Sequence, residues 1–302
     1  GIEVAQGRGA LRAWADVRGG QIVGGTADLA LADVNTTLSP DLQALVLPSV
    51  QGRLGGRRLN GGFEFSTQGL QFQTDDGLTW PGGNLRLVHT AATGKAPEQG
   101  EFRADRLDLA ALAQIASRLP LGATAHDAVR TYTPEGLVDE IQATWKGPLD
   151  ALQQYQVKGR IRGLALAATP TGAAPTHLGL RGATVDIDMT QAGGKAALTI
   201  ASGALVLPGV FEDPVLPLDR LSADVRWQLD GDRIAVQATD VQFANADAQG
   251  EARATWHTSD AGKVAHRSRF PGVLDLTGTL NRADGTRVHR YLPLSIPQES
   301  RH

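Results

Sequence analysis

Two carboxylates stand at a spacing that could support acid–base chemistry. Asp186 and Asp188 lie two residues apart on one face of an expected strand, and a pair of acids at a suitable separation can hydrolyse a glycosidic bond. Such a pair needs an environment that holds one carboxyl protonated and the other ionised. Nothing in the neighbouring residues predicts the necessary burial, so we interpret the pair as a solvated outer face. An enzyme acting on polysaccharide is kept as the least favoured alternative.

Other catalytic and metal-binding patterns are missing from the sequence. The seven histidines show no H-x-x-x-H spacing, and none stands beside a carboxylate in a recognisable relay. There is no cysteine and no G-x-S-x-G nucleophile motif. We therefore expect a protein that is not an enzyme, with no catalytic residue, no metal and no cofactor.

Composition excludes further classes of function. The 29 basic residues are balanced by 32 acidic ones, for a net charge of −3, which gives no electrostatic footprint for nucleic acid. Apolar residues make up 41% of the 302-residue chain, as in folded domains. No apolar run is long enough for a membrane-spanning helix.

The elements that position the side chains are expected to be strands. In the segment 221–229, Leu221, Ala223, Val225, Trp227 and Leu229 alternate with polar residues, which is the period of a strand with one apolar and one wet face. Turn signals such as the Gly in Asp-Gly-Asp at 230–232 recur at intervals of roughly 8–12 residues. The pattern predicts on the order of sixteen strands in a long antiparallel meander.

One segment has helical spacing instead. Apolar residues at 109, 112, 115, 116 and 119 follow Asp108, a plausible N-cap, and Pro120 is expected to end the helix. A second short helix is expected from Thr124, as its cap, to Tyr132. We divide the chain into a β-section 1–107, a helical segment 108–133 and a β-section 134–302, all within one continuous unit.

The apolar face has little to cover it. Many inward positions are small, including Ala223, Ala252 and Gly278, and small residues permit strong curvature and leave room inside. The sequence predicts a mainly β fold: an elongated, curved, groove-like sheet with a vacant apolar interior suited to acyl chains. A densely packed sandwich could use the same pattern, so both remain open.

Aromatic and aliphatic side chains of the inward positions are the candidate lining. Four tryptophans follow an apolar-x-Trp pattern near strand ends, either because large aromatics suit half-buried strands or because they form a row along one concave surface. For each candidate, ordinary core packing is an equal alternative to lipid contact. The candidates are Leu137, Ile141, Trp145, Leu221, Val225, Trp227, Trp256, Leu274 and Leu276.

Several short motifs, in order, resemble the AsmA-like proteins of the YhdP type. They are the runs at 100–112 (GEFRADRLDLAAL), 132–137 (YTPEGL), 143–145 (ATW), 207–214 (LPGVFEDP), 225–227 (VRW) and 241–247 (VQFANAD), with Gly250 close behind. They cover roughly residues 60–280.

This resemblance implies a Gram-negative envelope protein that is anchored in the inner membrane by a helix and is otherwise periplasmic. It also implies a β-groove that moves phospholipid between the inner and outer membranes and has no catalytic residues. We expect an internal piece of the full-length protein, with the anchor absent here, acyl chains as the bound partner and no nucleic acid. The main rival is an all-β surface adhesion or binding module without lipid.

Overall fold

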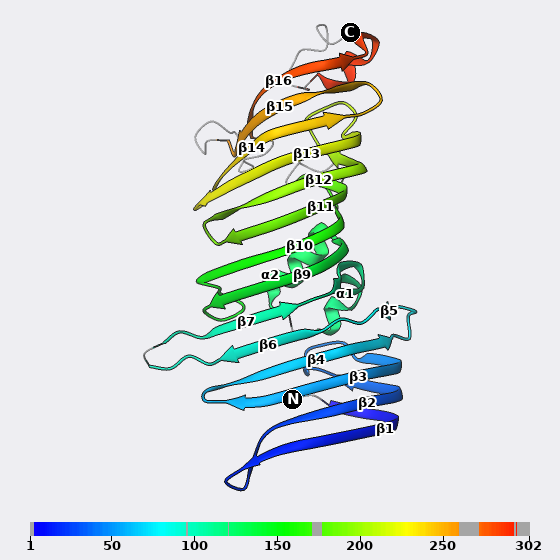
Figure 1. Ribbon diagram of the computed structural model, residues 1–302, viewed down its shortest axis with the longest axis vertical. Coiled ribbons are helices and arrows are strands. Elements are labelled where there is room, and N and C mark those ends of the chain that lie inside the picture. The colour runs from blue at the N-terminus through cyan, green and yellow to red at the C-terminus, as the bar shows by residue number, and fades with distance from the viewer. Residues whose placement is uncertain are drawn as a thin grey trace. The chain divides into compact units, whose positions relative to one another are not determined.

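The structure is a computed structural model that describes residues 3–94, 96–119, 121–170, 177–259, 272–292 and 294. These residues form sixteen strands and two short α-helices (Figure 1). The chain divides into two compact units, Gly1–Gly159 and Arg160–His302, with the boundary inside β10 (Gln154–Leu166). The predicted mainly β, antiparallel meander with a small helical segment is confirmed.

The first unit holds nine complete strands and the helical segment. Its strands are β1 (Glu3–Arg18), β2 (Gln21–Thr37), β3 (Leu45–Leu59), β4 (Gly62–Gln73), β5 (Thr79–Trp80), β6 (Leu85–Thr90), β7 (Gln99–Ala104), β8 (Leu107–Asp108) and β9 (Glu135–Lys146).

The second unit continues with six further strands and a 3-10 helix. These are β11 (Gly179–Thr190), β12 (Gly193–Val206), β13 (Val215–Asp230), β14 (Arg233–Ala244), β15 (Ala248–His257), β16 (Val273–Ala283) and η2 (Gly285–Tyr291).

The helices are α1 (Leu109–Ile115) and α2 (Ala123–Tyr132), with η1 (Ala116–Arg118) between them. Asp108 caps α1 as predicted, because its Oδ1 accepts the backbone N–H of Ala111 at 3.0 Å. The predicted cap of the second helix is wrong: Gly122 occupies that position and supplies no side-chain bond. The expected stop at Pro120 lies outside the described residues.

Strand order follows the chain. The hydrogen-bonded path runs β1-β2-β3-β4-β6-β7-β9-β10-β11-β12-β13-β14-β15-β16, with β5 added to β4 and β8 to β9. Antiparallel neighbours joined by short turns are the simplest product of alternating strands with Gly-rich connections. All sixteen strands belong to one sheet, so the described residues do not form a two-sheet sandwich.

Several long strands contain a residue in the left-handed region. In the second unit Gly182, Ser202 and Asp240 have φ of 75°, 64° and 50°, and the strand register shifts beside Gly182 and Asp240. In the first unit Gly52 and Asp33 have φ of 142° and 53°. An extra, unpaired residue of this kind bends a strand and increases its twist. The strands therefore bend part-way along their length.

The most buried side chains lie beside these bends. Ala183, Ile200 and Leu221 expose 0%, 2% and 7% of their surface. They stand opposite one another on β11, β12 and β13. In the first unit Ile115 of α1 and Val138 of β9 are almost fully buried. The packed core thus follows the bends and the helical segment, while the sheet beyond the bends is a single layer.

Candidate functional site

Cross-strand partners in the second unit align apolar side chains on one face of the sheet. Residues directly opposite on neighbouring strands point to the same side, so the register defines rows that cross the strands. The Val225 row consists of Ile187, Ala196, Val225, Ala238, Ala254 and Leu276.

A second row lies two residues nearer the turns that follow β11 and β13. Its two tryptophans are separated by one strand, about 10 Å apart at the usual strand spacing. The Trp227 row consists of Met189, Gly194, Trp227, Val236, Trp256 and Leu274.

Exposure rises along these rows and away from the bend. Val225, Trp227 and Trp256 are half-buried, whereas Leu274 and Leu276 on β16 expose 50% and 64% of their surface. Within this unit the described residues supply no second layer that covers the rows. These rows therefore form a partly exposed apolar surface.

The opposite face of the same strands carries mostly polar side chains. The row next to the Val225 row contains Lys195, Arg226, Gln237, Thr255 and Asp275, with Asp188 at its start. Arg226 and Asp224 are exposed. Asp186 lies on this face, is half-exposed and pairs with Arg160 at 3.7 Å. This arrangement supports the interpretation of the Asp186–Asp188 pair as a solvated face.

The first unit repeats this two-faced arrangement. Its Phe65 row consists of Ala15, Gly25, Gly56, Phe65, Leu87, Phe102 and Ala143, and the neighbouring Ile141 row of Ala13, Ala27, Leu54, Thr67, Leu85, Ala104 and Ile141. On the other face Arg53 pairs with Asp28 at 2.6 Å and Arg86 with Glu64 at 3.1 Å. The hydrogen bonds from these arginines lower the pKa of both carboxyls.

A third row lies at the end of the apolar face of the first unit, near the hairpin turns. The Trp145 row consists of Arg58, Phe63, His89, Gly100 and Trp145. His89 Nε2 lies 2.9 Å from Glu98 Oε1, and its ring stacks on Phe63 with centroids 5.2 Å apart. His89 and Glu98 therefore form a pair in the structure that was not predicted from the sequence.

Each unit has a tryptophan that lies over a glycine of the preceding strand in the sheet. Gly100 is the partner of Trp145, and Gly194 is the partner of Trp227. A Cβ at Gly100 would meet the Trp145 ring at 2.1 Å, and one at Gly194 would meet the Trp227 ring at 2.7 Å. These glycines give the large aromatic rings room to lie flat on the sheet.

Eight of the nine candidate lining residues fall in the apolar rows. Val225 and Leu276 share one row; Trp227, Trp256 and Leu274 share the next; Leu221 lies in the buried row beside the bend. In the first unit, Ile141 and Trp145 end their rows on β9.

Leu137 is the exception. It stands opposite Asp108, and the deeply buried residue there is its neighbour Val138, which pairs with Leu107 beside α1. The helical segment changes which side of the strand is covered at this point, and alternation alone does not reveal that.

Comparison with known proteins supplies the family. The family model described as YhdP protein matches residues 1–302. The chain belongs to the YhdP family. Comparisons with curated proteins and with solved structures gave no match.

Membership of the YhdP family indicates a cell-envelope protein related to lipid transport. YhdP proteins are not known as enzymes. Over the described ranges of this family member, no cluster of His, Cys, Asp and Glu is suited to a metal ion. None of its described helices has the length and hydropathy of a membrane span.

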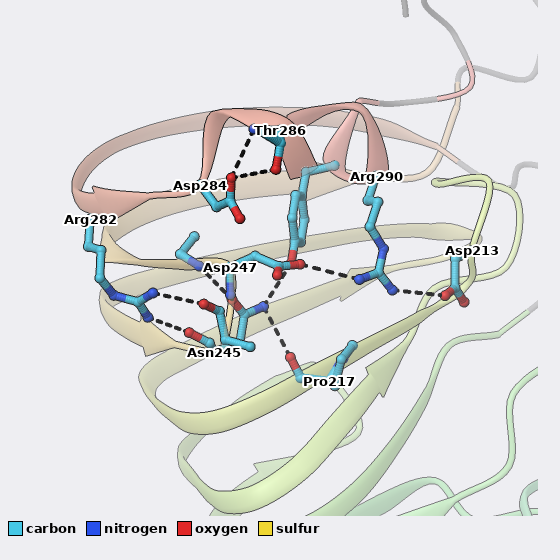
Figure 2. A network of polar contacts seen from close by, with 11 residues as sticks. Asp213, Pro217, Asn245, Asp247, Arg282, Asp284, Thr286 and Arg290 are labelled. Carbon is cyan, nitrogen blue, oxygen red and sulfur yellow. Dashed lines mark hydrogen bonds and ion pairs between the residues drawn. The ribbon is translucent and has the colours of Figure 1, made fainter. Parts of the chain in front are cut away.

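The YhdP-family motif at 241–247 forms a polar network rather than a reactive site (Figure 2). The Tyr291 hydroxyl donates to Asp247 Oδ2 at 2.7 Å and accepts from Asn245 Nδ2 at 3.1 Å. Arg290 donates to Asp247 and Asp213 at 3.3 and 3.4 Å. Burial, and then the bond to Asp247, raise the pKa of Tyr291. The network fastens η2 to the β14–β15 turn.

Proposed function

We propose that the apolar faces of the two units bind the acyl chains of phospholipids. In this proposal the periplasmic protein transfers phospholipid between the inner and outer membranes without catalysis, as part of a full-length protein anchored in the inner membrane. The observation that carries the proposal is the set of half-exposed apolar rows on one face of a single-layer sheet. The family supports it.

The physical reason is the cost of leaving these rows in water. Large contiguous apolar patches are rare on soluble proteins and mark interaction surfaces. An acyl chain laid on such a surface gains about 0.8 kcal/mol for each CH₂ removed from water. The rows offer hydrocarbon contact without requiring a tight polar pocket.

Small residues stand among larger ones in these rows, so the apolar surface is uneven and an acyl chain can lie between the larger side chains. In the Val225 row, Ala196, Ala238 and Ala254 lie between larger neighbours, and Gly194 does the same in the Trp227 row. A flexible methylene chain can adapt to such an uneven apolar surface, whereas a rigid protein surface would need a matching shape. This favours lipid over the adhesion module considered from the sequence.

The test is phospholipid recovered from the purified protein by organic extraction and mass spectrometry. We expect phospholipid in the wild type and a marked loss in Val225→Asp, because the new carboxylate stands in the middle of an apolar row. Arg226→Asp is the matched control: it adds the same group one residue away on the polar face and should retain the wild-type lipid. A wild-type protein free of phospholipid would contradict the proposal and favour the adhesion module.

A further inference from the structure

The Trp145 row differs from the other rows of the first unit because it mixes aromatic and polar groups. Phe63 exposes 45% of its surface, and the side chains of His89 and Glu98 retain 23% and 26%. These groups lie at the end of the apolar face beside the hairpin turns. A polar ligand group can reach them while its hydrocarbon part lies on the Phe65 and Ile141 rows.

Trp145 adds a donor without a partner. The residue is 91% buried, with 9% of its surface exposed, and its Nε1 has no hydrogen-bond partner. A buried N–H without a partner has lost its hydrogen bond to water and gained none in return, which is unfavourable. A ligand oxygen held at this end of the row would remove that cost.

Glu98 supplies the complementary charge. Its carboxylate accepts the Nε2–H of His89, and a carboxylate has two oxygens with several acceptor positions. The remaining acceptors, together with the exposed Phe63 ring, suit an ammonium group, which is attracted to carboxylates and to aromatic faces. His89 fixes the carboxylate in this position.

We propose that Glu98, His89, Phe63 and Trp145 form a headgroup site for a phospholipid that carries both an ammonium group and a phosphate. Glu98 and Phe63 hold the ammonium, and the indole N–H of Trp145 donates to a phosphate oxygen. This inference rests on the proposed function, because the acyl chains of the same lipid occupy the adjoining rows.

Charge favours a zwitterionic headgroup here over an anionic one. An anionic headgroup would place its phosphate near the Glu98 carboxylate without an ammonium to offset the repulsion. Arg58 lies in the same row but two strands from His89, about 10 Å away at the usual strand spacing. Among the described residues, the ion-pair partner of Glu98 is His89 and not Arg58.

The test is a choice between two lipids. The protein is incubated with vesicles of equal parts phosphatidylethanolamine and phosphatidylglycerol, re-isolated and extracted, and the bound lipids are quantified by mass spectrometry. We expect the wild type to be enriched in phosphatidylethanolamine by about tenfold, which corresponds to a difference of roughly 1.4 kcal/mol in binding free energy. Glu98→Gln should bring the ratio close to that of the vesicles, because binding of phosphatidylethanolamine loses its charge-assisted contact while binding of phosphatidylglycerol does not.

Two further variants make the result specific. Trp145→Phe keeps the ring over Gly100 but removes the donor. Because both lipids carry a phosphate, this variant should lower the total bound lipid and leave the enrichment close to that of the wild type. Glu101→Gln is the matched control, because Glu101 lies on the polar face of β7, the strand that begins directly after Glu98, and pairs with Arg86 at 3.9 Å. It should keep the wild-type ratio.

The outcomes separate this inference from the proposed function. Bound lipid with no enrichment in the wild type, or with the same enrichment in Glu98→Gln, would overturn the headgroup site alone. A wild type without any bound lipid would overturn the proposed function as well. Displacement of the lipid by soluble glycerophosphoethanolamine at equal concentration would show that the site binds the free headgroup without acyl chains. That result would also overturn the inference of a phospholipid headgroup site.

Discussion

At the scale of single residues, pairs that are distant in the sequence decide how the apolar face is built. Gly100 and Trp145 are 45 positions apart, yet they are cross-strand partners. The indole lies over the glycine because no Cβ stands in the way. A side chain at Gly100 would have to push the ring off the sheet.

We expect Gly100→Ala to destabilise the protein by about 1–3 kcal/mol, the usual cost of overpacking, as measured by urea unfolding. Gly56→Ala is the control, because a Cβ at Gly56 meets nothing within 4 Å; it should change the free energy of unfolding by less than about 0.5 kcal/mol. Equal effects of the two substitutions would contradict the close packing of Trp145 on Gly100.

The raised pKa of Tyr291 makes a second prediction at this scale. Tyr291→Phe removes the bonds to Asp247 and Asn245 and should cost about 1–2 kcal/mol near neutral pH. Because the pKa is higher in the folded state, this stabilisation is complete below the ordinary tyrosine pKa and is lost as pH rises through the raised value. Denaturant unfolding of both proteins across alkaline pH should show the difference between their free energies of unfolding becoming smaller as pH rises. A difference that stays constant would contradict the network.

At the scale of elements, alternation and turns were enough to predict most of the sheet. The segment 221–229 is a strand with the predicted apolar side, and Asp108 begins a helix as its side chain indicates. Each candidate lining residue was chosen because it stands at an alternating position, and its contact with lipid stays a prediction. Leu137 falls outside the rows because the helical segment covers a different side of β9 there.

The bends and the polar end of the Trp145 row were not predictable in the same way. Asp33, Ser202 and Asp240 adopt positive φ although their types do not require it, since the conformation is imposed by the neighbouring strands. His89 and Glu98 are nine positions apart across a hairpin, so they become a pair only once the register is set. Local sequence therefore predicts neither the bends nor the His89–Glu98 pair.

The bend of β14 can be tested at Asp240, which has φ of 50°. Asp240→Gly should leave stability unchanged or raise it slightly, because glycine adopts this conformation without strain. Asp240→Val should lower the free energy of unfolding by about 1–2 kcal/mol. Gln242→Val, at an exposed position of the same strand, should have little effect. A tolerated Asp240→Val would argue against a bend at this residue.

At the scale of the molecule, each unit separates hydrocarbon-like and ionic surfaces on opposite sides of one layer of strands. The strand order keeps neighbours in the chain adjacent in the sheet, so every strand contributes to both faces. An enzyme gathers a few reactive groups in one place, whereas these rows spread the same weak apolar contact over many strands. That distribution is what the proposed binding of acyl chains requires, since hydrocarbon contact is non-directional and proportional to the area covered.

Photo-crosslinking in living cells tests this separation of faces most directly. A photoreactive amino acid at Val225 or Leu276, which lie in one apolar row, should capture phospholipid. The same probe at Asp224 or Arg226, on the polar face of β13, should not. Equal labelling of both faces, or labelling of neither, would contradict the account.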